Sequence, residues 1–335
     1  MTALPDQSWA FCTSILNDVS RSFALIIPQL PAPLDRSLCV AYLLCRIADT
    51  IEDEPSLEGA VRQQLYDRFL ACIDERDPAC AADFIAAWPQ IPEGDYGRLV
   101  RGTREVLEAY RALPSAHHGP IRDCVHEMID GMRNVRPLVV RGGVAFICRD
   151  LEDLDRYCHY VAGVVGVMST RLFELHIGSR PGFAPDDAWR ERGRRMGLGL
   201  QMTNIIKDRT VDAERGVSFI PADYVDPAAD DFRTTRAGLA DLIEHTIAHL
   251  DEAMRYIAAI PPEQTGIRTF LLGSVLPAIA TLEVAAATDD PQPKITRDTM
   301  GEILNLLARS AGDDAVTRAW YDATRQRTLA HLGQP

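Results

Sequence analysis

Four aspartates occur as two pairs of equal spacing, Asp49 with Asp53 and Asp208 with Asp212. Each pair lies in a segment that reads as helix, and residues four apart share one face of a helix. Each helix would therefore point two carboxylates the same way, and four carboxylates aimed at one cavity would repel each other unless a hard cation lay between them. Mg²⁺ prefers oxygen ligands, keeps some of its waters and is often held by one or two carboxylates together with substrate phosphates. The two pairs therefore predict a magnesium site that handles a diphosphate.

Polar neighbours extend each pair into a stripe. Tyr42 and Arg46 fall on the same helix face as the first pair, and Gln201 and Asn204 precede the second pair in the same way. A surface helix also places polar residues opposite its apolar face, so a solvated face is the alternative for either stripe taken alone. Amide residues gain little from a helix interior. Their alignment with two acids, and the recurrence of the arrangement elsewhere in the chain, favours a site.

Helices must position these stripes, because apolar residues recur at helical spacing along the chain and strand-like alternation is almost lacking. We expect helices over residues 8–29, 32–53, 58–75, 96–112, 118–137, 151–177, 186–212, 236–260, 266–288, 297–310 and 313–332, separated by prolines and glycines. The sequence shows no long flexible linker, short repeat or low-complexity tract. It therefore predicts an all-α fold, with residues 1–335 forming a single domain around a central cavity.

Composition limits the partners. The chain has 335 residues, a net charge of −13, 47% hydrophobic residues and a mean hydropathy of −0.09, which is normal for a soluble globular protein. The acidic balance argues against nucleic acid as a partner and against electrostatic docking on anionic lipid. The apolar run from Phe270 to Ala287 approaches membrane-spanning length, but Pro277 and Glu283 interrupt it. We therefore expect a buried core helix and no transmembrane segment.

The cysteines indicate the redox compartment. All eight lie in the first half of the chain, none forms a CxxC pair, and several fall in apolar helical stretches. This pattern favours reduced, buried thiols over a disulfide framework. No secretory signal is visible at the start of the chain, so we expect a cytoplasmic protein.

Two histidines raise a second metal hypothesis. His245 and His249 are four apart on an expected helix, which makes a zinc site conceivable. No glutamate follows His245 as in an HExxH motif, and the sequence identifies no third ligand. A solvated helix face is the favoured interpretation.

The helix expected over residues 151–177 carries small residues on one side, among them Gly163 and Gly166. Glycine in a helix interior costs about 1 kcal/mol relative to alanine, so the two indicate close approach by another helix or by the chain of a ligand. Tyr157 lies on the other side. Its composition alone favours a core aromatic residue with a hydrogen-bonded hydroxyl.

Four runs follow one another in a fixed order along the chain. They are Ser20-Arg21-Ser22-Phe23, Asp49-Thr-Ile-Glu-Asp53, Tyr157-Cys-His-Tyr-Val-Ala-Gly163, and Gln201-Met-Thr-Asn204-Ile-Ile-Lys207-Asp208 continued to Asp212. In this order they resemble the squalene/phytoene synthase family, and within it the squalene synthases most. With a basic segment at residues 294–297 included, the resemblance covers nearly the whole chain.

The resemblance implies an isoprenoid synthase fold and the head-to-head condensation of two farnesyl diphosphates through presqualene diphosphate to squalene. Mg²⁺ held by Asp49, Asp53, Asn204, Asp208 and Asp212 would bind the diphosphate and neutralise its departing charge. Tyr157 matches a family tyrosine implicated in the first half-reaction, which makes it a catalytic candidate beside the four aspartates. The candidate substrate-binding residues, including Tyr42 and Gln201 from the two stripes, are Ser20, Arg21, Ser22, Phe23, Tyr42, Arg46, Gln201, Asn204, Lys207 and Phe270.

Squalene formation also requires a hydride, and the resemblance implies NADPH as its source. No strand followed by GxGxxG is present to support a dinucleotide site. One alternative is a synthase that ends at presqualene diphosphate or releases an unreduced or hydroxylated C30 product. Another is a non-catalytic isoprenoid-binding partner, against which the four aspartates, Arg46 and Tyr157 speak. We expect a cytoplasmic location that extends to the periphery of a membrane, with transient membrane contact for product release.

Overall fold

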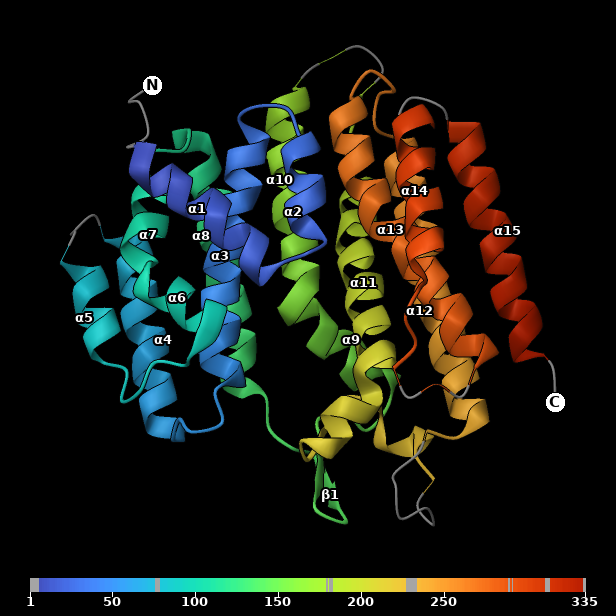
Figure 1. Cartoon of the computed structure of the whole chain (residues 1–335), viewed down its shortest axis with the longest axis horizontal. Coiled ribbons are helices and arrows are strands. Elements are labelled where there is room, and N and C mark those ends of the chain that lie inside the picture. The colour runs from blue at the N-terminus through green and yellow to red at the C-terminus, as the bar shows by residue number, and fades with distance from the viewer. Residues whose placement is uncertain are drawn as a thin grey trace. The chain divides into compact units, whose positions relative to one another are not determined.

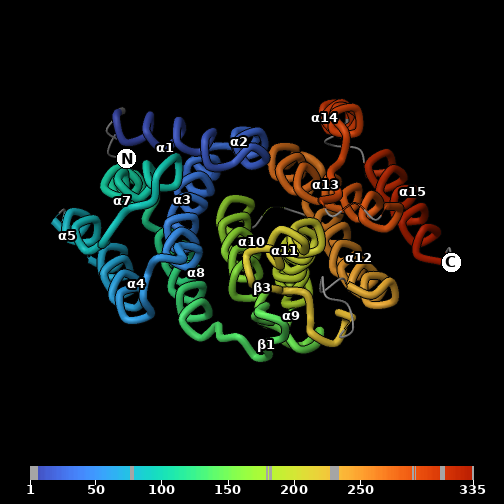
Figure 2. Tube along the Cα trace, turned by 60° about the horizontal axis from the view of Figure 1, so that its bottom comes forward, coloured from blue at the N-terminus to red at the C-terminus, as the bar shows by residue number. Residues whose placement is uncertain are grey.

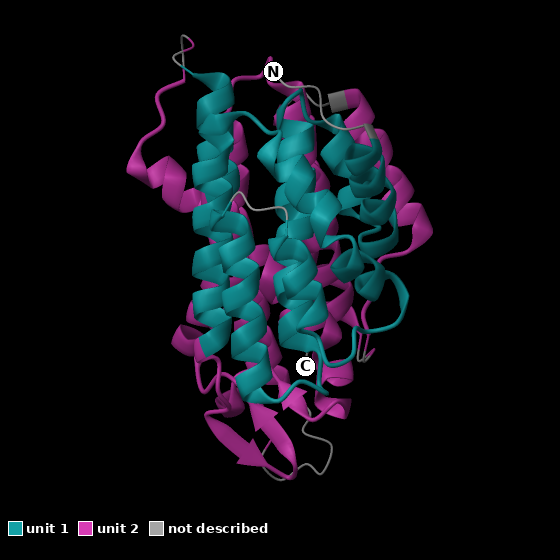
Figure 3. Cartoon of the chain, turned by 90° about the vertical axis from the view of Figure 1, so that its left-hand side faces the viewer, with its two compact units in different colours: residues 1–133, 168–178 teal, residues 134–167, 179–335 magenta. Residues whose placement is uncertain are grey.

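Helices account for most of the chain, which confirms the all-α prediction (Figure 1). The computed structural model describes residues 6–75, 79–178, 180, 183–226, 234–288, 290, 292–310 and 314–333. These residues group into two compact units (Figure 3): unit 1 comprises residues 1–133 and 168–178, and unit 2 comprises residues 134–167 and 179–335. The expectation of a single domain stays a prediction.

The elements up to residue 134 are helical. They are α1 (Asp6–Val19), α2 (Phe23–Ile26), the 3₁₀ turn η1 (Ile27–Gln29), α3 (Leu34–Asp53), α4 (Gly59–Asp74), α5 (Cys80–Ala86), α6 (Gly94–Arg101), α7 (Thr103–Arg111) and α8 (Ser115–Asn134). The core helix is α3, whose Leu43, Leu44 and Ile47 are fully buried. Figure 2 shows α1 lying beside α3 and α7, with which it packs.

The elements after residue 134 begin with a hairpin and continue as helices. They are β1 (Val139–Arg141), β2 (Val144–Phe146), α9 (Leu151–Cys158), the π-helical turn η2 (His159–Gly163), α10 (Val164–Ile177), α11 (Asp187–Glu214), β3 (Val217–Ser218), the 3₁₀ turn η3 (Ala222–Tyr224), α12 (Arg236–Ala258), α13 (Thr265–Ala287), α14 (Arg297–Ser310) and α15 (Asp314–Leu332). Within unit 2, α11 packs against α12, α13 and η2.

Two expected helices are broken where a tertiary contact or a turn intervenes. The helix expected over residues 8–29 stops at Val19 and resumes at Phe23, so Ser20, Arg21 and Ser22 lie in a turn rather than in a helix. The helix expected over residues 96–112 divides at Gly102, where an added Cβ would lie 1.9 Å from the ring of Phe11. The short helix α5 was not expected, and the first residue of the helix expected over 313–332 lies outside the described residues.

The few strand residues form one small sheet, which agrees with the expectation of almost no strands. β1 pairs antiparallel with β2, with Val139 opposite Phe146, and β2 pairs parallel with β3, with Ala145 opposite Val217. Gly142 and Gly143 supply the positive φ angles of the hairpin turn. Because β3 follows α11 directly, the sheet fixes the chain just beyond Asp212.

The cysteine prediction is wrong at one place. Cys72 and Cys80 form a disulfide, with their Cα atoms 5.4 Å apart. The others are free, buried thiols: Cys12, Cys39, Cys45, Cys124, Cys148 and Cys158. Sequence spacing could not reveal the bridge because it joins the end of α4 to the start of α5, an element that was not expected.

The most apolar helix is α13. Among the described residues it is the one helix long and apolar enough to cross a membrane, and 67% of its apolar window is buried in the protein. Pro277 lies inside this continuous helix, and Thr281 donates a hydrogen bond from its hydroxyl to the Pro277 carbonyl at 2.8 Å. Such burial is typical of a core helix, as the sequence suggested.

Candidate functional site

The stripe on α3 is a chain of polar contacts within unit 1. The Tyr42 hydroxyl donates to the backbone carbonyl of Val19 at 3.3 Å, and Arg46 Nη2 donates to the Tyr42 hydroxyl at 3.3 Å. Arg46 Nη1 lies 3.3 Å from Asp49 Oδ2. Three of the four residues expected on this face are therefore connected in one line, one helical turn after another.

Acidic groups crowd the last turn of α3. Burial raises the pKa of Asp49 to about 6, the Arg46 charge opposes this, and Asp53 adds to it. Glu52, between the two aspartates in sequence, has its pKa raised to about 8 by burial and by both of their charges, with Arg62 acting in the opposite direction. Carboxyl groups held this close favour a divalent cation, because the cation offsets both their burial and their mutual repulsion, the two effects that raise their pKa values.

Arg62 fixes the end of the same helix. Its Nε donates to the carbonyl of Ile51 at 3.2 Å and its Nη2 donates to the carbonyl of Glu54 at 3.0 Å. Carbonyl groups at a helix C-terminus lack partners within the helix, and a cation there is favoured by the helix dipole. Arg62 therefore positions the turn that carries Asp53, a role that the sequence analysis missed.

Aromatic rings surround the Arg46 guanidinium. It lies 5.6 Å from the centroid of Tyr42 and 5.7 Å from that of Tyr96, and the ring of Phe23 lies 5.2 Å from Tyr42. Cation–π contacts of this kind hold a guanidinium without neutralising it. Tyr96 was missed because it comes from α6, and nothing in its own spacing indicates a neighbour on α3. Ser20, Arg21 and Ser22 reach this region through the turn before Phe23, whose N–H donates to Ser20 Oγ at 3.1 Å.

The second stripe lies on α11 in unit 2. Lys207 Nζ is 3.0 Å from Asp208 Oδ2, and the two side chains are 32% and 42% exposed. Asn204 is exposed, whereas Gln201 and Asp212 are half-buried. Carboxylate and amide oxygens that remain open to solvent are suitable ligands for Mg²⁺. The first aspartate pair belongs to unit 1 and the second to unit 2, so the expectation that both face one cavity stays a prediction.

Tyr157 occupies the last turn of α9, directly before the π-helical turn η2. Its ring stacks on that of Phe219 with centroids 4.8 Å apart and an interplanar angle of 26°. A π-helical turn inside an α-helix is rare and is frequent at functional sites. Neither the turn nor Phe219 was expected, because both depend on contacts outside the local pattern.

Gly163 and Gly166, the glycine row after Tyr157, lie where two helices pack closely, as does Gly197 on α11. A Cβ added at Gly166 would lie 2.2 Å from the carbonyl oxygen of Gly193, and one added at Gly197 would lie 2.3 Å from that of Ala162. Of the two expected uses of the small residues, another helix is the one observed, and that helix is α11. The segment that carries Tyr157 is therefore packed on the helix that carries Asp208 and Asp212.

Phe270, the last predicted site residue, is buried on α13, which packs against α11. A cavity of about 1110 Å³ also opens in unit 1, lined by residues of α4, α7 and α8 such as Asp74, Tyr110 and His126. None of the predicted site residues lines it. The cavity is therefore separate from the two aspartate stripes, which stay the candidate site.

Residues 16–299 match the squalene/phytoene synthase family. Among curated relatives, squalene synthase 1 of Arabidopsis thaliana is 28% identical over 335 residues, covering 95% of this chain and 75% of the relative. Squalene synthase of Nicotiana benthamiana is 30% identical over 273 residues, and the match spans 76% of this chain but only 60% of the relative's length. Inactive squalene synthase 2 of Arabidopsis thaliana is 30% identical over 333 residues, covering 93% of this chain and 73% of the relative.

Solved structures share the fold. TcSQS in complex with the ligand BPH1237 superposes with a TM-score of 0.74 at 23% identity, covering 97% of this chain and 98% of that one. A dehydrosqualene synthase in complex with a ligand superposes with a TM-score of 0.60 at 19% identity, covering 91% and 96%. At 19–23% identity, these matches show that the fold is shared and nothing more.

Proposed function

The chain belongs to the squalene/phytoene synthase family, and on that basis we propose that it joins two farnesyl diphosphates head to head, through presqualene diphosphate, to squalene. The observation that carries the proposal is the pair of aspartate stripes, each set beside a basic side chain. Arg46 lies 3.3 Å from Asp49, and Lys207 lies 3.0 Å from Asp208. A diphosphate leaving group requires acidic groups that hold a cation and, next to them, basic groups that bind the phosphate oxygens.

The donor set of each stripe fits Mg²⁺. Asp49 and Asp53 would hold it on one helix, and Asn204, Asp208 and Asp212 on the other, all through oxygen. When bound, Mg²⁺ supplies positive charge that stabilises the departing diphosphate. Arg46 and Lys207 bind diphosphate oxygens, and the turn of Ser20, Arg21 and Ser22 adds hydroxyl and guanidinium donors.

The aromatic residues serve the hydrocarbon part of the substrate. The stacked faces of Tyr157 and Phe219 favour an adjacent allylic cation. Phe23 in unit 1 and Phe270 in unit 2 would each offer an apolar contact to a farnesyl chain. Closure of the cyclopropane releases a proton. A free tyrosine has a pKa of about 10 and is a poor base at neutral pH, so a proton-transfer role for Tyr157 requires a neighbouring group that takes up the proton its hydroxyl gives away.

Two other outcomes follow from the relatives. The dehydrosqualene synthase of the same fold makes an unreduced C30 product a second candidate, in which NADPH takes no part. The inactive squalene synthase at 30% identity makes a non-catalytic isoprenoid-binding protein a third. The presence of the four aspartates, Arg46 and Tyr157 favours catalysis. We also propose a cytoplasmic enzyme that contacts a membrane transiently, because squalene is insoluble in water.

The deciding experiment is incubation of the purified protein with farnesyl diphosphate and Mg²⁺, with and without NADPH, followed by analysis of the products. Squalene that appears only with NADPH is the expected result. Presqualene diphosphate, or an unreduced or hydroxylated C30 product, in both tubes would keep the condensation and remove the reduction. Unconsumed substrate in both tubes would overturn the proposal in favour of a binding protein or another chain length.

A further inference from the structure

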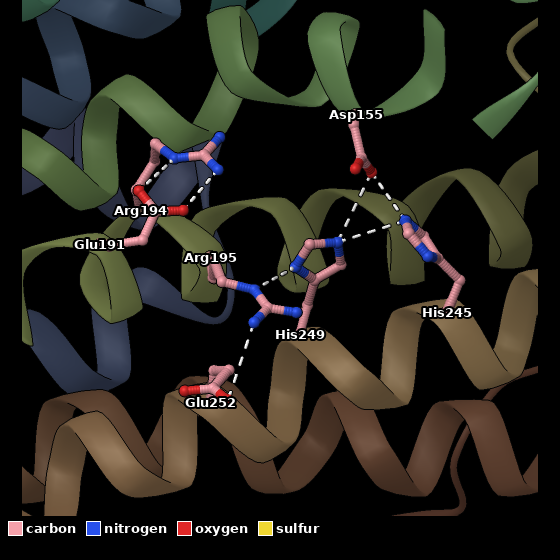
Figure 4. A network of polar contacts seen from close by, with 7 residues as sticks. All are labelled: Asp155, Glu191, Arg194, Arg195, His245, His249 and Glu252. Carbon is pink, nitrogen blue, oxygen red and sulfur yellow. Dashed lines mark hydrogen bonds and ion pairs between the residues drawn. The ribbon is translucent and has the colours of Figure 1, made fainter. Parts of the chain in front are cut away.

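Asp155 supplies the third group that the histidine pair lacked in the sequence. It lies on α9, ninety residues before His245, and points at His245 and His249 on α12 (Figure 4). The carboxylate and the two imidazoles bring all their potential ligand atoms within 4.8 Å of one another. His249 is only 3% exposed, so the solvated-face interpretation is wrong for this residue.

The three facing atoms form a small triangle. His245 Nε2 lies 2.7 Å from Asp155 Oδ1, His249 Nε2 lies 3.5 Å from the same oxygen, and the two Nε2 atoms are 3.3 Å apart. A tetrahedral ion with bonds of about 2.0–2.1 Å holds neighbouring ligand atoms roughly 3.3 Å apart. Two sides of the triangle have about this length already, and the third reaches it by a shift of under about 1 Å. The triangle is therefore close to one face of a zinc tetrahedron.

We propose that Asp155, His245 and His249 bind one first-row divalent transition metal, best matched by Zn²⁺, which joins α9 to α12. Two imidazoles and one carboxylate suit Zn²⁺ and its neighbours, whereas the all-oxygen stripes suit Mg²⁺. Three protein ligands leave a fourth position for water. The partial exposure of Asp155 and His245, 38% and 27% of their side chains, gives that water and the ion a way in.

The protonation of the groups agrees with this. Burial lowers the pKa of His249, as do the charges of His245 and Arg195, against the opposing influence of Asp155. Burial pushes the pKa of Asp155 upward, but hydrogen bonds from both histidines outweigh it and the pKa is lowered. A neutral imidazole and an ionised carboxylate are the forms that ligate metal, so both pKa shifts favour the ligating forms of His249 and Asp155.

Arg195 on α11 sets the affinity of the site. Its Nε donates to His249 Nδ1 at 3.2 Å, and its Nη1 lies 3.7 Å from Glu252 Oε1 (Figure 4). A histidine that ligates through Nε2 carries its proton on Nδ1, where it would meet the Arg195 N–H donor directly. Binding therefore requires Arg195 to release His249, and Glu252 is placed to keep the guanidinium afterwards.

Direct titration tests the site. Purified full-length protein with excess Mg²⁺ is titrated with Zn²⁺ against a chromophoric chelator, and Co²⁺ is used in parallel because its visible spectrum reports tetrahedral imidazole ligation. Wild type is expected to bind one equivalent of Zn²⁺, and Asp155→Asn or His245→Gln should lower the affinity for Zn²⁺ by at least about tenfold. His126→Gln is the matched control, since His126 also pairs with an aspartate, Asp74, at 3.1 Å. The absence of stoichiometric binding by wild type, or its retention in Asp155→Asn, would overturn the proposal.

Arg195 offers a gain of affinity that a misfolded variant could not mimic. Glutamine Oε1 is as many bonds from Cα as arginine Nε, so Arg195→Gln places an acceptor where the donor was, opposite the Nδ1 proton. Zn²⁺ should bind about tenfold more tightly to this variant. Arg195→Lys keeps the charge without supplying the acceptor and should show a smaller gain. Unchanged or weaker binding by Arg195→Gln contradicts the geometry proposed.

The aspartate stripes are the competing location for an added metal. The double variant Asp49→Asn/Asp208→Asn leaves the histidine cluster intact and should keep both the equivalent of Zn²⁺ and the Co²⁺ spectrum of wild type. Loss of both in this variant would assign the ion to the stripes and refute the proposal.

Discussion

Arg46 Nη1 lies 3.3 Å from Asp49 Oδ2, one turn earlier on the same helix. The same guanidinium donates to the Tyr42 hydroxyl and faces the ring of Tyr96. Because these contacts come from a phenol, a carboxylate and a π-face, Arg46 stays charged and keeps capacity for an anion. Its environment therefore orients the side chain that we expect to meet a diphosphate first.

Arg46→Gln should lower kcat/KM for farnesyl diphosphate by about 10²-fold, because a preorganised charge at the leaving group is lost. Arg46→Lys should recover part of this loss, since it restores the charge without the planar fork. Steady-state kinetics with saturating Mg²⁺ measures both. Arg98→Gln is the control: Arg98 lies in the same unit and pairs with exposed Asp18 and Asp95 at 3.1 Å. Equal effects of Arg46→Gln and Arg98→Gln would remove Arg46 from the site.

Asp49→Asn and Asp208→Asn should each reduce turnover by at least about 10²-fold and raise the Mg²⁺ concentration needed for half-maximal rate. An amide remains a neutral oxygen donor but lacks the charge that attracts the cation. Asp322→Asn, which removes an exposed pair with Arg318 on α15, should change neither quantity. Normal product formation by both stripe variants would refute the magnesium assignment.

Gly197→Ala should destabilise the protein by about 1–3 kcal/mol, because the new methyl group would force apart the backbones of α11 and η2. The carbonyl oxygen of Ala162 lies 2.3 Å from the position of that Cβ. Gly301→Ala is the matched control on α14, where nothing lies within 4 Å, and it should stabilise by about 0.5–1 kcal/mol. Denaturant unfolding measures both, and destabilisation of similar size in the two variants would mean that helix contact is not the cause.

Metal-free protein should lose stability as the pH falls from about 7.5 to about 5.5, in part through His249. Burial lowers the pKa of this imidazole, so below its ordinary pKa the unfolded chain binds a proton that the folded chain does not. Asp155, whose pKa is lowered, contributes stability that is present above about pH 4 and lost below it, outside this window. Arg195 and His245 also contact the His249 ring, and both residues are present in the two proteins compared.

The measurement is the free energy of unfolding against pH, in the presence of a chelator, for wild type and His249→Gln. A flatter curve for the variant in this window is expected. His117, whose pKa burial also lowers, titrates in both proteins and cancels in the difference. Parallel curves would show that His249 is not the group responsible.

The two aspartate stripes could be found in the sequence because helical spacing is a local property: each stripe, from Tyr42 to Asp53 and from Gln201 to Asp212, occupies about three turns of one helix. Glu52 lies between Asp49 and Asp53 in the sequence but is not four residues from either, so the spacing did not single it out. Tyr96, Phe219 and Asp155 could not be found in this way, since each acts on a residue far away in the chain. The same holds for the break at Gly102, which depends on the ring of Phe11. Side-chain contacts between elements are set by packing, and no regular spacing in a single sequence indicates which residues of different elements will meet.

The π-helical turn η2 shifts the phase of the long helical segment from Leu151 to Ile177. One residue more than an α-helix needs is taken up in that turn, which rotates everything before it by about 100° relative to everything after it. A helical wheel drawn through the whole segment therefore misplaces Tyr157 against the glycine row. Removing a single residue within η2 would restore an unbroken α-helix and turn Tyr157 away from Phe219, while leaving every side chain of the segment's second half in place.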